Sequence, residues 1–183
     1  MGAKGKIGLI GLAVMGANLA RNLAGHGIST VVYNRSRDKT ENFLKEFGSD
    51  TNLSGAAALE ELVNSLEKPR KIILMIKAGE AVDAMIAKLI PLLEKDDIRI
   101  DGGNSFFEDT RRRSREMEAL GVHFVGMGVS GGEEGALHGP SLMPGGTREA
   151  YDALAPILKA VSAKAEGEAC VDYMGSDLSL IHI

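Results

Sequence analysis

The sequence has little cysteine, no long hydrophobic run and no excess of positive charge. One cysteine among 183 residues, Cys170, excludes an internal disulfide framework and is consistent with a reducing cytosol. No stretch approaches the roughly 20 apolar residues that a membrane-spanning helix needs. The formal net charge of −4 provides no basic field to attract nucleic acid. These absences predict a cytoplasmic protein that binds neither nucleic acid nor membranes.

Familiar metal and nucleophile patterns are also missing. The four histidines have no metal-ligand spacing, and Cys170 lies far from the first three of them. No serine elbow and no cysteine–histidine arrangement is present. Glu133 and Glu134 are adjacent acids in a glycine-rich loop, which are usually just exposed. We therefore expect no metal site.

Short β-branched runs alternate with longer helical patterns, which is typical of a parallel sheet covered by helices on both faces. Strands are expected at residues 6–10, 30–34, 71–76, 98–101 and 123–127, with shorter ones near 163–165 and 169–173. Helices are expected at residues 15–24, 39–47, 57–65, 81–93, 107–120 and 148–160. The pattern predicts one Rossmann-like, doubly wound α/β domain over residues 1–175 with a mostly parallel sheet.

Three consecutive arginines, Arg111, Arg112 and Arg113, lie on the predicted helix at residues 107–120. Acidic residues are interspersed nearby, so a solvated, salt-bridged helix face is expected rather than a nucleic-acid site. The same helix spaces Met117 and Leu120 at helical intervals. Farther along, the residues from Pro144 to Gly146 indicate a turn.

The first predicted strand runs directly into Gly11, and a helix begins near Gly16. The first glycine permits a tight turn, and the last one lets helix and strand pack closely. The N-terminus of such a helix offers backbone N–H groups to a pyrophosphate. Ala13 replaces the middle glycine of the usual motif and restricts the approach of the phosphates. The strand–turn–helix context predicts a dinucleotide site rather than an ordinary turn.

The end of the second predicted strand discriminates between the two nicotinamide dinucleotides. NAD-preferring domains place Asp or Glu there to bond the ribose 2′-hydroxyl. This sequence instead reads Asn34, Arg35, Ser36 and Arg37, with Lys39 one turn later. A guanidinium bonds a 2′-phosphate in a bidentate manner, whereas a carboxylate repels it. The cluster favours NADP(H) over NAD(H), the alternative being a solvated basic loop.

Five runs resemble 6-phosphogluconate dehydrogenases in order and spacing. They are GLAVMG at 11–16, NRS at 34–36 with Lys39 after it, MIKAG at 75–79, DGGNS at 101–105 and GVSGGEEGALHGPSLMPGG at 128–146. The resemblance covers nearly the whole chain up to Gly175. It implies oxidative decarboxylation of 6-phospho-D-gluconate to ribulose 5-phosphate and CO2, with reduction of NADP+, in the oxidative pentose phosphate pathway. It also implies a homodimeric full-length enzyme.

The resemblance assigns site residues by position. The cofactor-binding positions are Gly11, Ala13, Val14, Met15, Gly16, Asn34, Arg35, Ser36, Lys39, Ile76, Lys77, Ala78, Asn104 and Glu133. The substrate-binding positions are Asn104, Ser130, Gly131 and Gly132. Met15 would lie near the nicotinamide, and Asn104 would lie where nicotinamide and substrate meet. Asn104 and Ser130 each follow a predicted strand, at the edge where ligands bind in open α/β sheets.

A complete catalytic set is not expected in this chain. Oxidation of a secondary alcohol needs a general base, and the enediol formed by decarboxylation needs an acid. The resemblance places both, a Lys and a Glu, on helices C-terminal to the Rossmann domain, where an all-helical domain follows. Residues 176–183 read SDLSLIHI instead, so we expect a non-native or truncated tail and weak turnover. A frameshift, a vector-derived tail and a deliberate boundary are the alternatives.

Two other functions remain open from the sequence. A β-hydroxyacid dehydrogenase of the 3-hydroxyisobutyrate type shares the glycine turn, but its counterpart of DGGNS normally reads as an Asp-x-Ser-Thr turn. Asn104 and Ser105 therefore argue against it. The other alternative is a non-catalytic NADP(H)-binding module that senses the cofactor ratio or docks a partner.

Overall fold

The chain folds into alternating strands and helices, and the computed structural model describes residues 4–49 and 51–176. The strands are β1 (Ile7–Ile10), β2 (Thr30–Tyr33), β3 (Leu53–Gly55), β4 (Lys71–Leu74), β5 (Ile98–Asp101), β6 (His123–Ser130), β7 (Ser141–Gly146), β8 (Lys164–Ala165) and β9 (Glu168–Ala169). The helices are α1 (Val14–Gly25), α2 (Arg37–Phe47), α3 (Leu59–Asn64), α4 (Glu80–Leu89), α5 (Phe107–Glu118), α6 (Gly132–His138), α7 (Arg148–Val161) and the 3-10 turn η1 (Ile90–Leu92).

A seven-stranded sheet organises the domain in the order β3-β2-β1-β4-β5-β6-β7. Neighbouring strands pair in parallel except β6 and β7, which are antiparallel. The chain runs outward from β1 to β3 and then crosses to β4 on the other side of β1, so β1 and β4 flank the switch point. Ligands of open α/β sheets bind at that point. The predicted doubly wound, mostly parallel fold is confirmed.

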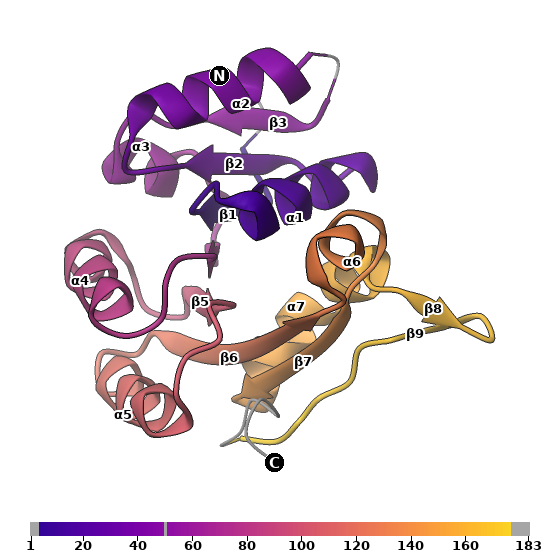
Figure 1. Ribbon diagram of the computed structural model, residues 1–183. Coiled ribbons are helices and arrows are strands. Elements are labelled where there is room, and N and C mark those ends of the chain that lie inside the picture. The colour runs from indigo at the N-terminus through magenta and orange to yellow at the C-terminus, as the bar shows by residue number, and fades with distance from the viewer. Residues whose placement is uncertain (1–3, 50, 177–183) are drawn as a thin grey trace.

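Two apolar cores cover the two faces of the sheet. One contains Leu19 of α1, Phe43 of α2 and Leu154 of α7. The other contains residues of α3, α4 and α5, among them Leu62 and Met117. Figure 1 shows α4 and α5 on one side of the sheet and α6 and α7 on the other. Burial on both faces explains why the strands read as continuous apolar runs.

Several predicted elements differ from the structure. Helix α4 ends at Leu89, because Pro91 cannot continue an α-helix, and η1 follows it. Strand β3 and helix α6 were not predicted, since both are short and rich in small residues. Leu120 lies beyond the end of α5 and is 53% exposed, so its expected place in the helical apolar spacing is wrong. The short strand expected near residues 163–165 is confirmed as β8. The one expected near 169–173 is wrong in its extent, because β9 ends at Ala169 and Val171 makes only an isolated bridge with Leu142.

The predicted turn at residues 144–146 is wrong, because these residues form the end of β7. Pro144 is tolerated there because β7 is the last strand of the sheet, where a missing backbone N–H breaks no ladder between central strands. The segment after β9 runs along β7. Leu142 N donates to Cys170 O at 3.0 Å, Met174 N to Pro144 O at 2.9 Å, and Gly146 N to Gly175 O at 3.0 Å.

The expected tail at 176–183 lies, apart from Ser176, outside the described residues. Among the helices that are described, none combines the length and the apolar character needed to cross a bilayer.

Candidate functional site

The turn between β1 and α1 depends on two glycines. Gly11 has φ +105, and a Cβ there would lie 2.3 Å from the carbonyl oxygen of Met75. A Cβ on Gly16 would lie 1.9 Å from the carbonyl oxygen of Gly11. Both distances are far below contact, so side chains at either position would force the turn away from β4. The turn predicted from the sequence can therefore pack against the end of β4 only because both positions lack a side chain.

The N-terminus of α1 opens at this turn without a side-chain cap. Ala13 is the N-cap residue and makes no side-chain capping bond. Asn34, directly after β2, links the β1–α1 turn to the β2–α2 loop. Its Oδ1 accepts from Leu12 N at 3.1 Å, and its Nδ2 donates to Ser36 O at 3.3 Å. An uncapped helix N-terminus of this kind offers its first backbone N–H groups to an anion.

A hollow of about 510 Å³ lies beside this turn, and we call it the cation-lined hollow. Its walls come from the glycine turn, the β2–α2 loop, the end of β4 and one face of α4. They are formed by Ile10, Gly11, Ala13, Asn34, Arg35, Ser36, Lys39, Met75, Ile76, Lys77, Ala81, Ala84, Met85 and Lys88. The α4 residues were not predicted. Their spacing of three and four positions along one helix face is the signal that would have found them.

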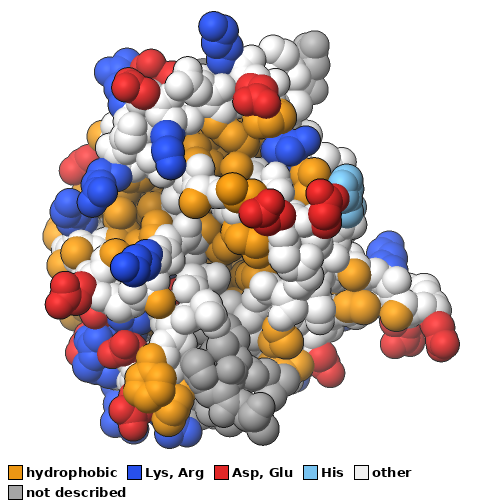
Figure 2. All heavy atoms as spheres, in the orientation of Figure 1, with side chains coloured by type: hydrophobic (Ala, Val, Ile, Leu, Met, Phe, Trp, Pro, Cys, Tyr) orange, Lys and Arg blue, Asp and Glu red, His pale blue; other side chains and the backbone are white. Residues whose placement is uncertain are grey.

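Four cations line this hollow: Arg35, Lys39, Lys77 and Lys88. Within residues 4–49 and 51–176, none of them has a carboxylate at ion-pair distance, whereas Arg37 on the same segment pairs with Glu41 at 2.6 Å. Figure 2 shows Lys and Arg side chains to the left of an apolar centre on this face. Unpaired cations around a concave surface favour a ligand of high negative charge.

A second hollow, of about 570 Å³, adjoins the first, and we call it the strand-end hollow. It is lined by Met15, Met75, Ile76, Gly102, Gly103, Asn104, Val129, Ser130 and Met143. Met75 and Ile76 belong to both hollows, so the two lie side by side at the end of β4. The lining of the strand-end hollow combines the apolar side chains of Met15, Met75 and Val129 with the amide of Asn104 and the hydroxyl of Ser130, an arrangement suited to a flat ring beside a polar substrate.

The side chain of Asn104 reaches this hollow from a strained loop. Asn104 has φ +60, the left-handed region that asparagine tolerates better than most residues. Asp101 holds the loop on both sides of it. Gly103 N donates to Asp101 Oδ1 at 3.0 Å, and the Ser105 hydroxyl donates to Asp101 Oδ2 at 2.6 Å.

Some predicted site residues line neither hollow. Gly16 is buried at the glycine turn, and Val14, 53% exposed, lies at the start of α1. Ala78 is half-buried after β4. Gly131, Gly132 and Glu133 are exposed at the start of α6, where the Glu133 carbonyl accepts from Asn18 Nδ2 at 2.9 Å. The structure thus gathers the remaining predicted positions into two joined hollows and leaves these at their margins.

The prediction that the three consecutive arginines lie on a solvated helix face is wrong for Arg113. Arg113 is fully buried, and its guanidinium bonds Asp83, Asp101, Ser105 and the Gly79 carbonyl. Arg112 is exposed and pairs with Asp83, Asp109 and Glu116, as expected. The hydrogen bond from Arg113, assisted by Arg112, lowers the pKa of Asp83 to about 2.

Arg99 on β5 is a second buried arginine, and apolar residues lie beside it on both neighbouring strands. Its strand neighbours are Ile72 on β4 and Phe124 on β6. Its guanidinium carbon lies 5.2 Å from the centre of the Phe124 ring. None of its three nitrogens has a hydrogen-bond partner in the described part of the chain. Burial lowers the pKa of Arg99 to about 10.

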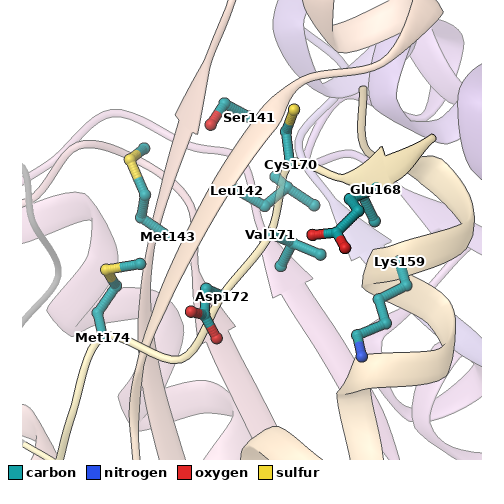
Figure 3. A pocket seen from close by; sticks show the side chains of 10 residues that line it. Ser141, Leu142, Met143, Lys159, Glu168, Cys170, Val171, Asp172 and Met174 are labelled. Atoms are coloured by element: carbon teal, nitrogen blue, oxygen red, sulfur yellow. The ribbon is translucent and has the colours of Figure 1, made fainter. Parts of the chain in front are cut away.

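A third hollow, of about 650 Å³, contains none of the predicted site residues. It lies between β7, α7 and residues 168–174. Figure 3 shows Ser141, Leu142 and Met143 facing the segment that carries Cys170 and Val171. The Cys170 thiol is half-buried. Over residues 4–49 and 51–176, no three His, Cys, Asp or Glu side chains gather as metal ligands would.

Comparison with protein families gives one match over most of the chain. The family described as the NAD binding domain of 6-phosphogluconate dehydrogenase matches residues 6–175. A Bacillus subtilis protein named NADP(+)-dependent, decarboxylating 6-phosphogluconate dehydrogenase is 58% identical over 175 residues, which is 96% of this chain and 37% of the relative. The decarboxylating 6-phosphogluconate dehydrogenase of Chlamydia muridarum is 55% identical, over 95% of this chain and 36% of the relative.

Solved structures share the same architecture. Plasmodium falciparum 6-phosphogluconate dehydrogenase, described in its apo form and with NADP+ or 6-phosphogluconate, superposes with a TM-score of 0.90 at 46% identity. The match covers 94% of this chain and 37% of that one. Mycobacterium tuberculosis 3-hydroxyisobutyrate dehydrogenase gives a TM-score of 0.79 at 20% identity, a likeness of fold alone. The chain therefore spans little more than a third of the length of the 6-phosphogluconate dehydrogenases that it matches.

Proposed function

The chain belongs to the family of NAD-binding domains of 6-phosphogluconate dehydrogenase, and we propose that it binds NADP(H) with the 2′-phosphate on Arg35 and Lys39. The observation that carries this proposal is the position of these two unpaired cations. They lie at the end of β2, beside the glycine turn, where an NAD-preferring domain carries an acid. The name of the Bacillus subtilis relative, which includes NADP(+), supports it.

The residues present fit a dinucleotide. The turn at Gly11 and Gly16 leaves no room for a Cβ at either position, so the backbone there stays bare, and α1 begins there without a side-chain cap. Met15 and Met75 give the adjoining strand-end hollow an apolar lining, which excludes water from a ring placed there. When bound, the nicotinamide supplies the hydride acceptor.

For the whole protein we propose the oxidative decarboxylation of 6-phospho-D-gluconate to ribulose 5-phosphate and CO2, in the cytoplasmic oxidative pentose phosphate pathway and as a homodimer. Asn104, Ser130, Gly131 and Gly132 would face the substrate, since the first two line the strand-end hollow. An amide orients a substrate hydroxyl without changing its own charge. The general base and acid would come from a Lys and a Glu outside residues 6–175, so this chain contributes cofactor binding and little turnover.

Parallel titrations of the chain with NADPH and NADH, near physiological salt, test the cofactor proposal. NADPH is expected to bind at least about tenfold more tightly, the equivalent of about 1.4 kcal/mol. Arg35→Ala should remove most of that preference, because it deletes the guanidinium beside the 2′-phosphate.

Arg37→Ala is the matched control. Arg37 lies two positions away, pairs with Glu41 and does not line the cation-lined hollow, so its removal should leave the preference unchanged. Tighter binding of NADH than of NADPH would refute the proposal. An equal loss of preference in both variants would mean that general surface charge, and not the placement of Arg35, selects the cofactor.

A further inference from the structure

Arg113 uses its whole guanidinium to join α5 to two other segments, residues 79–83 and 101–105. Nε and Nη2 donate to the two carboxylate oxygens of Asp83 on α4, at 2.8 and 3.0 Å. Nη2 also donates to the Gly79 carbonyl at 3.1 Å. Nη1 donates to the Ser105 hydroxyl at 3.0 Å and to Asp101 Oδ2 at 3.4 Å. These contacts occupy all five N–H donors of the group.

The segments that Arg113 joins are continuous in sequence with residues that line the hollows. Gly79 ends the loop that follows β4, whose Ile76 lines both hollows. Ser105 ends the loop that presents Asn104 to the strand-end hollow. Arg113 itself lines neither hollow and is fully buried. It therefore acts on any ligand through these loops and without touching it.

The two loops do not depend on Arg113 to the same degree. Helix α4 is anchored in the core by Val82, Ile86 and Leu89, each at most 6% exposed. Residues 102–104 are two glycines and an asparagine, with no apolar side chain to hold them. Gly102 N donates to Leu74 O at 3.0 Å at the start of this loop. Beyond it, the conformation, including φ +60 at Asn104, is held by the bonds of Asp101 to Gly103 and Ser105 and by those of Arg113 to Asp101 and Ser105. Loss of the guanidinium should therefore displace Asn104 more than it displaces α4.

We propose that Arg113 is a positioning residue that holds Asn104 in place and thereby sets the nicotinamide end of the site. This inference rests on the proposed binding of NADP(H). A lysine at this position keeps the charge, but its single ammonium cannot make the bidentate contact with Asp83 and reach Ser105 together. Arg113→Lys is thus expected to loosen the Asn104 loop while α4 stays in its core contacts.

Two probes separate this role from a general role in folding. In the proposed binding mode NADPH would occupy both hollows, whereas adenosine 2′,5′-bisphosphate carries the adenosine and 2′-phosphate but no nicotinamide. Arg113→Lys should weaken NADPH about tenfold, on the scale of one charge-assisted hydrogen bond, and change the affinity for the bisphosphate by less than about twofold. Arg112→Lys is the matched control: it shares Asp83 at 2.9 Å but is exposed, and should alter neither affinity.

A double-mutant cycle with Asn104→Gly tests whether the effect passes through Asn104. Glycine accepts φ +60 and removes the amide. If Arg113 acts through that amide, the double variant should bind NADPH no more weakly than Asn104→Gly alone, whereas independent effects would add. Should Arg113→Lys prove unfolded by circular dichroism, Ser105→Ala removes one of the contacts with less disturbance and should show the same selective loss, at about threefold.

An equal loss for both probes, or no loss for either, would overturn the inference and leave Arg113 a purely structural residue. Additive effects in the cycle would overturn it as well. Failure of the wild-type chain to bind either probe would instead refute the proposed cofactor binding. A wild type that binds NADPH normally, beside an Arg113→Lys variant without selectivity, would refute the positioning role alone.

Discussion

Replacing Arg99 with methionine is expected to stabilise the protein. Arg99 is fully buried, its guanidinium lies 5.2 Å from the centre of the Phe124 ring, and that guanidinium has no hydrogen-bond partner among the residues that the structure describes. A buried polar group without a partner costs free energy in the folded state that it does not cost in the unfolded chain. Methionine is unbranched and of similar length, so it fills the same space without a charge.

The magnitude follows from the pKa of the group. Burial lowers it from 12.5 to about 10, which corresponds to roughly 3 kcal/mol at 1.36 kcal/mol per pH unit. Methionine would forfeit the contact of the guanidinium with the Phe124 ring, worth about 1 kcal/mol. The expected gain is therefore about 2 kcal/mol in the free energy of unfolding, or roughly 4 to 8 °C in Tm for a domain of this size.

Urea unfolding followed by circular dichroism measures this change, since the chain has no tryptophan to report by fluorescence. The midpoint should rise while the m-value stays constant, because the surface exposed on unfolding is nearly unchanged. Arg99→Gln is the control: it removes the charge but keeps a buried amide without a partner, so it should gain less than Arg99→Met.

A loss of stability in Arg99→Met would refute this reasoning. It would mean that the Arg99 guanidinium is hydrogen-bonded in solution and that its attraction to Asp101 outweighs its desolvation. An equal rise in the free energy of unfolding in both variants would mean that the buried charge of Arg99 accounts for its whole destabilising effect, with no contribution from unmet hydrogen bonds.

Two further perturbations have defined outcomes. Gly16→Ala should weaken NADPH binding at least about tenfold and lower the free energy of unfolding by about 1–3 kcal/mol, because its Cβ would meet the Gly11 carbonyl at 1.9 Å. Gly25→Ala, with no atom within 4 Å of the new Cβ, should do neither, and titration with urea unfolding compares them. Asp83→Asn should lower the free energy of unfolding, because it removes a carboxylate whose pKa is lowered from 3.8 to about 2 by its arginine partners in the folded protein. That deficit against wild type should be present above pH 3.8 and fade as the pH falls through about 2, so a deficit unchanged at pH 2 in urea unfolding would contradict the pairing.

That the glycine turn and the β2–α2 loop lie side by side could be predicted, because both are local in sequence. Gly11, Gly16 and Arg35 belong to one β–α–β segment, whose geometry is fixed by the turn itself. Asn104 and Ser130 could be placed because parallel strands bring their ends to one edge of the sheet. The α4 wall was missed, although the spacing of Ala81, Ala84 and Lys88 carries the signal.

The buried arginines could not be predicted from local pattern. Three consecutive arginines look alike in the sequence, and the phase of α5 alone decides that Arg113 faces inward with Thr110 and Met117. Its partner Asp83 lies 30 positions away. Arg99 alternates with Ile98 and Ile100, as on a strand with one solvated face, but helices cover both faces of this sheet.

The antiparallel strand β7 is an outer strand of the sheet, where edge-to-edge pairing between copies of this chain could begin. An outer strand with free N–H and C=O groups is a template for strands from other molecules, and such addition begins aggregation. Here the backbone of residues 170–175 bonds along β7, and Pro144 interrupts the donors of that strand. The opposite border, β3, is three residues long. Both borders of the sheet are thus poor templates, which favours a dispersed protein during expression and in the concentrated binding assays proposed above.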